Sequence, residues 1–300
     1  MFWEELTQSN FKDAIKKTGG VCVIPVGCLE KHGQHMPVGT DQFIAEDVVE
    51  AACKLEEVMI FRIGGWFGDV TPYHAQQDSS ELMGAIALKT DFLVRVLEEV
   101  VDEIARNGFD KIIICSSHGG NVPFLHHFIR CQAYSDKPYT TMWAWAVRDE
   151  LTEPDKLVKL FAEKPEEFKM ITDKDIKALE DFIPRGFGGG HADFREVALV
   201  MAHRPELIDE TQYDDPFCLV PAPFETSSAS PKTGKQEISL ANGAFAGNWS
   251  CYYGYPPYGA SQNIGLAMEK IQSERLARIF KRVKESDDIY NVVTMDRKNK

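Results

Sequence analysis

The loop after residues 21–27 gathers side chains suited to metal chemistry. Residues 21–27 read as a buried strand, and Glu30 and His32 follow directly. These two are two positions apart, so in extended backbone their side chains point to the same side. Gly33 lets the loop fold back and bring Asp41 to the same point. Carboxylate and imidazole ligands favour divalent zinc, manganese or iron; the alternative is an acidic surface loop with incidental histidines.

A second histidine stands at the end of another apolar run. Residues 111–115 are continuously apolar after the first position, as expected of a central parallel strand. His118 follows, and Gly119 and Gly120 then permit close approach of the backbone to a ligand. Asn121 is placed to begin the next helix. The alternative is a hydrogen-bonded histidine at a strand end.

His191 and Glu196 form a third cluster. They lie on a turn that follows the glycines at 188–190 and leads into a short helix ending near His203. Alone, either residue would more often be a surface or capping residue. Three such clusters at three turns of the chain favour a shared site.

A charge count favours two metal ions over one. Glu30, Asp41 and Glu196 carry three negative charges, while His32 and His118 are neutral ligands. One divalent ion would leave a net negative charge, whereas two ions with a bridging hydroxide neutralise the site, the cheaper state away from water. A shared carboxylate holds such ions about 3.5–4 Å apart, and each lowers the pKa of bound water towards about 7. The predicted chemistry is hydroxide attack on a metal-polarised carbonyl.

The composition narrows the class of protein. The chain has 300 residues, 44% hydrophobic, and a net charge of −13, which argues against nucleic acid or an anionic membrane as partner. Seven cysteines without a CxxC pair indicate reduced thiols in the cytoplasm, and Cys28 and Cys115 are expected to be inert. No signal peptide and no membrane-spanning run are evident. We expect a soluble cytoplasmic protein acting on a small molecule.

Alternating helix and strand patterns predict the scaffold. Helices are expected over 4–17, 41–55 (capped by Asp41), 89–107, 121–132, 153–182, 196–203 and 261–286, and strands over 21–27, 58–63, 111–115 and 140–147. This alternation indicates a layered α/β domain with a mostly parallel sheet. A single domain over 1–300 is expected. Its long irregular segment, 209–258, would pack on the core or on a neighbouring copy.

Three motifs carry a family resemblance. Residues 27–33 with 37–41 resemble the opening motif of the creatininase (creatinine amidohydrolase) family. Residues 117–121 resemble its second motif, and residues 190–192 with Glu196 its third. The resemblance spans about residues 1–205. It implies a three-layer α/β/α fold with a mostly parallel sheet, a homohexamer and a dinuclear metal site.

The resemblance also implies roles for individual residues. The implied metal ligands are Glu30, His32, Asp41, His118 and Glu196. Asp41 would bridge two divalent ions, zinc, manganese or iron, and His191 would transfer a proton or orient the substrate. His35 is a candidate for orienting a ligand.

The chain departs from the family pattern at several positions. Gly120 stands where creatininase itself has a ligand glutamate, which argues against creatinine as substrate. Asp193, Phe194, Val197 and Ala198 replace residues of the third motif, and residues 82–85 replace a Phe-Pro-Gly-Thr segment. Candidate substrate contacts are Gly119, Gly120, Asn121, Trp145 and His74.

Three functions fit this pattern. The first is hydrolysis of a C–N bond in a small cyclic amide or formamide by a dinuclear-metal hydroxide. The second is hydrolysis of a C–C bond in a cyclic diketone, such as one derived from inositol. The third is a non-catalytic family member whose metal stabilises an oligomer; retention of five ligands and His191 argues against it.

Overall fold

The computed structural model describes residues 1–70, 84–132, 134, 137–185, 190–213 and 256–286. Within them, one four-stranded sheet runs in the order β2-β1-β3-β4 with every pairing parallel. The strands are β1 (Val21–Val26), β2 (Met59–Ile60), β3 (Lys111–Ser116) and β4 (Thr140–Trp145). The parallel sheet agrees with the sequence prediction, although β2 is shorter than the predicted 58–63.

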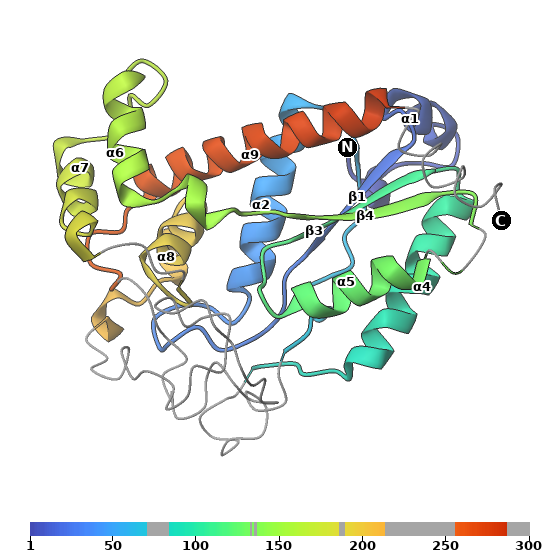
Figure 1. Ribbon diagram of the computed structural model, residues 1–300, viewed down its shortest axis with the longest axis horizontal. Helices are drawn as coiled ribbons and strands as arrows, with labels where there is room; N and C mark the ends of the chain where they lie inside the picture. The colour runs from blue at the N-terminus through green and yellow to red at the C-terminus, as the bar shows by residue number, and fades with distance from the viewer. Residues whose placement is uncertain (71–83, 133, 135–136, 186–189, 214–255, 287–300) are drawn as a thin grey trace.

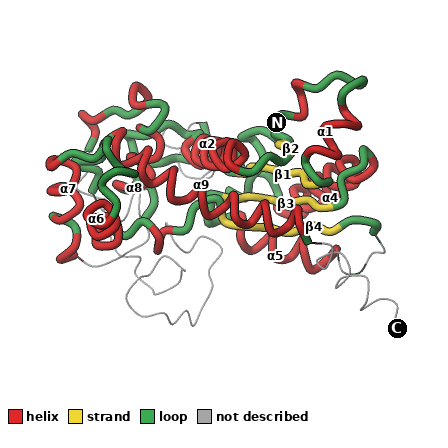
Figure 2. The backbone as a smooth tube through the Cα atoms, turned by 90° about the horizontal axis from the view of Figure 1, so that it is seen from above, coloured by secondary structure: helices red, strands yellow, loops and turns green. Residues whose placement is uncertain are grey.

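Helices cover both faces of this sheet (Figures 1 and 2). On one face lie α2 (Thr40–Leu55), α8 (Phe194–Met201) and α9 (Gln262–Glu285), and on the other α1 (Phe11–Lys17), α4 (Thr90–Arg106) and α5 (Asn121–Gln132). Alternate residues of β1 face opposite layers: Val21 and Val23 pack with the first group, Cys22 and Ile24 with the second. The predicted three-layer α/β/α fold is confirmed.

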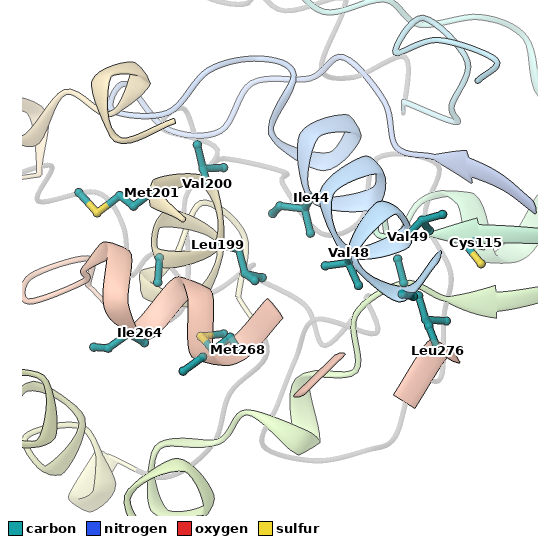
Figure 3. Close-up of a cluster of buried hydrophobic side chains, with 14 of the residues drawn as sticks. Ile44, Val48, Val49, Cys115, Leu199, Val200, Met201, Ile264, Met268 and Leu276 are labelled. Carbon is teal, nitrogen blue, oxygen red and sulfur yellow. The ribbon is translucent and has the colours of Figure 1, made fainter. Parts of the chain in front are cut away.

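Helices α2, α8 and α9 form one packed unit, in which α2 and α9 contact the sheet and α8 packs on both of them (Figure 3). Ile44 of α2, Leu199 of α8 and Met268 of α9 are all buried in this cluster. Gly265 lets α9 approach α8 closely, because a Cβ there would lie 1.8 Å from the carbonyl oxygen of Ala198. This contact fixes the position of α8 relative to the sheet.

The predicted helix over 4–17 is interrupted. A 3₁₀ turn, η1 (Trp3–Glu5), precedes α1, and the residues between them form a separate turn. There the Thr7 backbone N–H donates to Asn10 Oδ1 at 3.0 Å. Short polar side chains offer the backbone such an alternative to helical hydrogen bonds, which explains the break.

The predicted helix over 153–182 is two helices, α6 (Pro154–Glu163) and α7 (Asp173–Glu180). Pro165 lacks a backbone N–H and disfavours helical conformation in the residue before it. Thr172 and Asp175 then form a capping box that starts α7. The remaining 3₁₀ turns are η2 (Asp149–Leu151), η3 (Ile183–Arg185), η4 (Pro205–Leu207) and η5 (Glu210–Gln212).

Two further expectations concern the rest of the chain. Most of the predicted irregular segment, 209–258, lies outside the described residues. None of the helices in the described part has the length and apolar character needed to cross a membrane.

Candidate metal centre

Two side chains tie together the loops at the carboxyl ends of the strands. Asn121 Nδ2 donates to the carbonyl oxygen of Gly27 (2.9 Å), and its Oδ1 accepts from the Asp69 N–H (2.7 Å). Ser117 Oγ donates to the backbone carbonyl of Asp41 (2.6 Å). The loops after β1, β2 and β3 are therefore held at fixed separations. Carboxyl ends of parallel strands are where open α/β sheets build their sites.

All the predicted ligands and the predicted catalytic histidine meet at this edge of the sheet. They are Glu30, His32, Asp41, His118, His191 and Glu196. Asp41 Oδ2 lies 3.1 Å from His118 Nδ1 and 3.6 Å from His32 Nε2. Glu196 Oε2 lies 3.7 Å from His32 Nε2. Glu30 Oε1 lies 3.4 Å from His118 Nδ1 and 3.5 Å from His191 Nδ1.

Each of the three histidines directs one ring nitrogen, the inner nitrogen, towards the carboxylates of the centre. In each ring the nitrogen that points away from the centre, the outer nitrogen, contacts a backbone carbonyl oxygen. His32 Nδ1 lies 3.2 Å from that of Glu30, His118 Nε2 lies 3.0 Å from that of Asp69, and His191 Nε2 lies 2.8 Å from that of Lys31. Carbonyls only accept hydrogen bonds, so these outer nitrogens carry the hydrogen. In each neutral ring the inner nitrogen then has its lone pair directed at the carboxylates. The inner nitrogen of His32 is buried, with no hydrogen-bond partner among the described residues.

The electrostatics of the cluster favour cations. Burial lowers the pKa of His32 and His118, but the surrounding carboxylates outweigh it and raise the two values to about 9 and about 10. Burial raises the pKa of Glu196 to about 8. Against its own burial, the neighbouring imidazoles hold the pKa of Asp41 well below its usual range. Burial and the nearby His32 lower the pKa of His191 to about 3. Without metal, protons on His32 and His118 thus offset part of the negative charge of the carboxylates. Bound divalent cations would neutralise that charge instead.

Asp41 is shared between two sets of possible ligands. One set is Cys28, Glu30, Asp41 and His118; a second is His32, Asp41 and Glu196; a third is Glu30, His32 and His191. Within each set the ligand atoms lie within 4.8 Å of one another. The sharing of Asp41 is the arrangement that a bridging carboxylate requires. Asp41 lies inside the first turn of α2, whose N-cap is Gly39, so the predicted capping role is wrong; its carboxylate faces the histidines instead.

Glu196 is positioned by the start of α8. Asp193 is the N-cap of this helix, and its Oδ1 accepts from the backbone N–H groups of Arg195 and Glu196. The buried guanidinium of Arg195 pairs with Asp193 at 3.0 Å and with Asp149 at 2.9 Å. Asp193, one of the residues that depart from the family motif, therefore shapes the turn that presents Glu196.

Two histidines cross-link this turn to the loop after β1 in a reciprocal manner. His191 Nε2 contacts the carbonyl of Lys31, and His35 Nε2 contacts the carbonyl of Ala192 (2.9 Å). Ala192 has φ 57°, a left-handed conformation that costs a non-glycine residue about 1–2 kcal/mol. Its N–H donates to Glu196 Oε2 at 2.5 Å. His35 thus acts on the backbone beside a predicted ligand rather than on a ligand side chain.

The predicted substrate contacts differ in their surroundings. Gly119 is exposed, with open space around a Cβ built on it. A Cβ on Gly120 would lie 2.4 Å from His118 Nε2 and 2.5 Å from the Asp69 carbonyl oxygen. Asn121 is fully buried, and its amide holds the loops together, so a direct substrate contact would require breaking those bonds.

Two aromatic side chains, Trp145 and His74, are also predicted substrate contacts. Trp145 is half-buried at the end of β4, beside Ser116 in register, and packs edge-on against Trp143 with ring centroids 5.6 Å apart. The two side chains therefore share a face, as their spacing predicted. His74 lies outside the described residues.

Cys28 is the residue whose place in the centre sequence reasoning missed. Its thiol donates to Asp41 Oδ2 at 3.1 Å. Burial, and then the nearby carboxylates, raise the pKa of this thiol well above its usual value. The signal that was available is spacing: Cys28, Glu30 and His32 alternate along the loop, so their side chains can share one side.

A family model matches nearly the whole sequence. The model described as creatininase (creatinine amidohydrolase) matches residues 4–280. The chain belongs to the creatininase family. The structure described as "Creatininase Mn" superposes with a TM-score of 0.64 at 18% identity, covering 95% of this chain and 99% of that one. Hydrolases of the creatininase family therefore share its fold.

Two relatives are hydrolases named for different substrates. The creatinine amidohydrolase of Pseudomonas putida is 22% identical over 244 residues, covering 77% of this chain and 82% of the relative. The 3-dehydro-scyllo-inosose hydrolase of Thermotoga maritima is 25% identical over 158 residues, covering 50% of this chain and 47% of the relative. The second match thus spans about half the length of each protein.

Proposed function

We propose that this protein is a metal-dependent hydrolase that holds two divalent ions, shared through Asp41, and cleaves the C–N bond of a small cyclic amide or formamide. One observation carries the proposal. Six possible ligand atoms, three carboxylate oxygens and three imidazole nitrogens, converge at one buried point while the outer N–H groups of the rings are engaged elsewhere. Carboxylates gathered in this way repel one another unless protons or metal cations lie between them.

The donor set fits borderline divalent ions. Imidazole nitrogens with carboxylate oxygens suit zinc, manganese or iron, and one structure of similar fold is named for its manganese. Glu30, Asp41 and His118 would hold one ion, and His32, Asp41 and Glu196 the other. Bound ions of this kind supply an activated water and polarise the carbonyl to be attacked.

His191 is the residue we propose for proton transfer. Its Nε2 is fixed on the Lys31 carbonyl, and its Nδ1 faces the centre 3.5 Å from Glu30 Oε1. Burial and the nearby His32 lower the pKa of His191 to about 3, so the ring is neutral at pH 7; we propose that Nδ1 takes up the proton that the attacking water releases. It can then deliver that proton to the departing nitrogen of the substrate.

A second candidate reaction is cleavage of a C–C bond beside a ketone. The match to the Thermotoga maritima inosose hydrolase favours it, although that match covers half of the chain. The same carboxylates and histidines would serve, with the proton from His191 going to carbon instead of nitrogen.

The deciding experiment combines metal analysis with a substrate screen. Purified protein would be analysed for zinc, manganese and iron and then assayed on cyclic amides, formamides and cyclic diketones. We expect about two ions per chain and turnover of a C–N substrate that is lost in His118→Ala. The control is His203→Ala, which removes an exposed histidine paired with Glu269. Turnover of diketones alone would establish the second reaction, and bound metal without turnover of any substrate would favour a structural role.

We also propose that the chain forms a homo-oligomer, a hexamer by family resemblance. Sedimentation at micromolar concentration would test it, and a monomer there would contradict it.

A further inference from the structure

The Cys28 thiol contacts the carboxylate that the two halves of the centre share. Cys28 is fully buried, and its Sγ lies 3.1 Å from Asp41 Oδ2. That oxygen is also the atom 3.1 Å from His118 Nδ1 and 3.6 Å from His32 Nε2. One oxygen atom therefore faces a thiol and the inner nitrogens of two histidines.

The backbone around Cys28 gives the thiol a fixed direction. The preceding residue, Gly27, donates its N–H to Gln42 Oε1 (2.9 Å) and accepts from Asn121 Nδ2 (2.9 Å). Gly68 packs directly on Cys28, since a Cβ on Gly68 would lie 2.6 Å from the Cβ of Cys28. The side chain is thus confined where it reaches Asp41.

We propose that Cys28 is a positioning residue whose thiol donates to Asp41 Oδ2 and fixes the orientation of the shared carboxylate. The inference rests on the proposed function, in which the Asp41 carboxylate binds both ions. A carboxylate can rotate about its Cβ–Cγ bond, and a donor on one oxygen selects the rotamer that points the oxygen between the histidines. Groups that orient metal ligands in this way commonly change metal affinity by about 10–100-fold when removed.

The competing role for Cys28 is direct ligation. Its sulfur belongs to the same ligand set as Glu30, Asp41 and His118. The hydrogen bond to Asp41 favours the donor role, because the thiol proton already has an acceptor in the cluster. A ligand would instead give up that proton, and the sulfur would bond to the metal.

Three variants separate these roles. Cys28→Val removes the donor at nearly constant volume, and Cys28→Ser keeps a donor on a shorter bond. Cys22→Val is the matched control, because Cys22 is an equally buried thiol of β1 that packs in a hydrophobic cluster and belongs to none of the ligand sets. Zinc affinity would be measured on metal-free protein by competition with a chromophoric chelator, with folding checked by circular dichroism.

We expect Cys28→Val to bind zinc about 10–100-fold more weakly than wild type, Cys28→Ser to stay close to wild type, and Cys22→Val to match it. Unchanged affinity in Cys28→Val, or equal loss in the serine and valine variants, would overturn the inference. Absence of zinc binding in the wild-type protein would instead contradict the proposed function.

Cobalt substitution gives a test that depends on no variant. Wild-type protein loaded with Co²⁺ should show no thiolate-to-cobalt charge-transfer band in the near ultraviolet, since we place the sulfur outside the coordination sphere. Such a band, absent from Cys28→Ser, would make Cys28 a ligand and overturn the donor role.

Discussion

The two sides of the candidate metal centre are held in different ways. Glu30 and His118 lie on loops that leave neighbouring parallel strands, and Asp41 lies in the first turn of α2; the side chains of Asn121 and Ser117 donate to backbone carbonyls and join these segments. We call this the sheet side. His191 and Glu196 lie at the start of α8, which packs on α2 and α9 and is not part of the sheet; we call this the turn side.

The turn side does not follow a strand of the described sheet, and side-chain contacts set its position. Imidazole-to-carbonyl contacts from His35 and His191 join it to the loop after β1, and a buried Arg195–Asp193 pair shapes its first residues. A rigid sheet therefore presents one half of the ligands, whereas single side chains can adjust the other half. Substitutions on the sheet side should abolish the centre, and those on the turn side should tune it.

The largest effect is expected at the shared carboxylate of the sheet side. Asp41→Ala should lose both ions together and all measurable activity, because each ligand set around the two ions contains Asp41. Elemental analysis of the purified variant measures this directly. Asp155→Ala, which removes an exposed carboxylate of α6, is the control. Two ions retained in the Asp41 variant would show that the carboxylate does not bridge.

His191 tests whether the turn side contributes to chemistry or to metal binding. We expect His191→Ala to keep near-normal metal content while turnover falls by roughly two to four orders of magnitude, the usual contribution of a positioned acid–base group. Metal content and kcat would be measured on the same preparation. Loss of an ion would make His191 a sixth ligand, in keeping with its place in a set with Glu30 and His32; full activity would remove it from the mechanism.

A smaller effect is expected from loosening the turn side. His35→Ala removes the contact with the Ala192 carbonyl. The backbone N–H of Ala192, which donates to Glu196 Oε2, is then less well positioned. One ion should bind about 10–100-fold more weakly while the other is unchanged. Isothermal titration calorimetry resolves the two events. His35→Gln, which can keep a donor, should restore part of the affinity, and equal weakening of both ions would argue against separate sides.

The smallest effect concerns stability of the metal-free protein. His32 and His118 have folded-state pKa values of about 9 and about 10, above the ordinary 6.5. The stabilisation that these two protonated histidines give the folded state is complete below pH 6.5, and it is lost as the pH rises through their folded-state pKa values. Chelator-treated protein should therefore show a Tm that falls between pH 7 and 10 more than that of metal-loaded protein. Parallel pH profiles for the two forms would contradict this.

The sheet side was accessible from sequence because it follows a general rule. Apolar runs of β-strand length ending in Glu, His or Gly predicted both strands and the loops after them, and parallel strands bring such loops together. This rule alone was enough to predict Glu30, His32 and His118 as residues of one site. Asp41 was found by residue type, but its predicted capping role was wrong because capping rules ignore what a distant loop offers the same carboxylate.

The residues of the turn side were predicted from their types on a turn after glycines and from the family motif, but their contacts were not. Nothing in the local pattern around His191 predicts that its ring reaches the Lys31 carbonyl, 160 positions away in sequence. The left-handed Ala192 is equally unpredictable, since alanine carries no local preference for that conformation. Cys28 was expected to be inert because no base is evident beside it in the sequence; its acceptor, Asp41, lies 13 residues away. Contacts between distant segments decide these roles.

Gly120 limits how this centre can change over evolutionary time. Any side chain there begins with a Cβ that overlaps the His118 ring and a backbone carbonyl, so a single substitution cannot add a carboxylate at this point without displacing a histidine of the centre. The loop carrying Asp69 would have to shift first, and that loop is bonded to Asn121. A fourth acidic ligand at this position would therefore require the His118 ring and the loop carrying Asp69 to move as well.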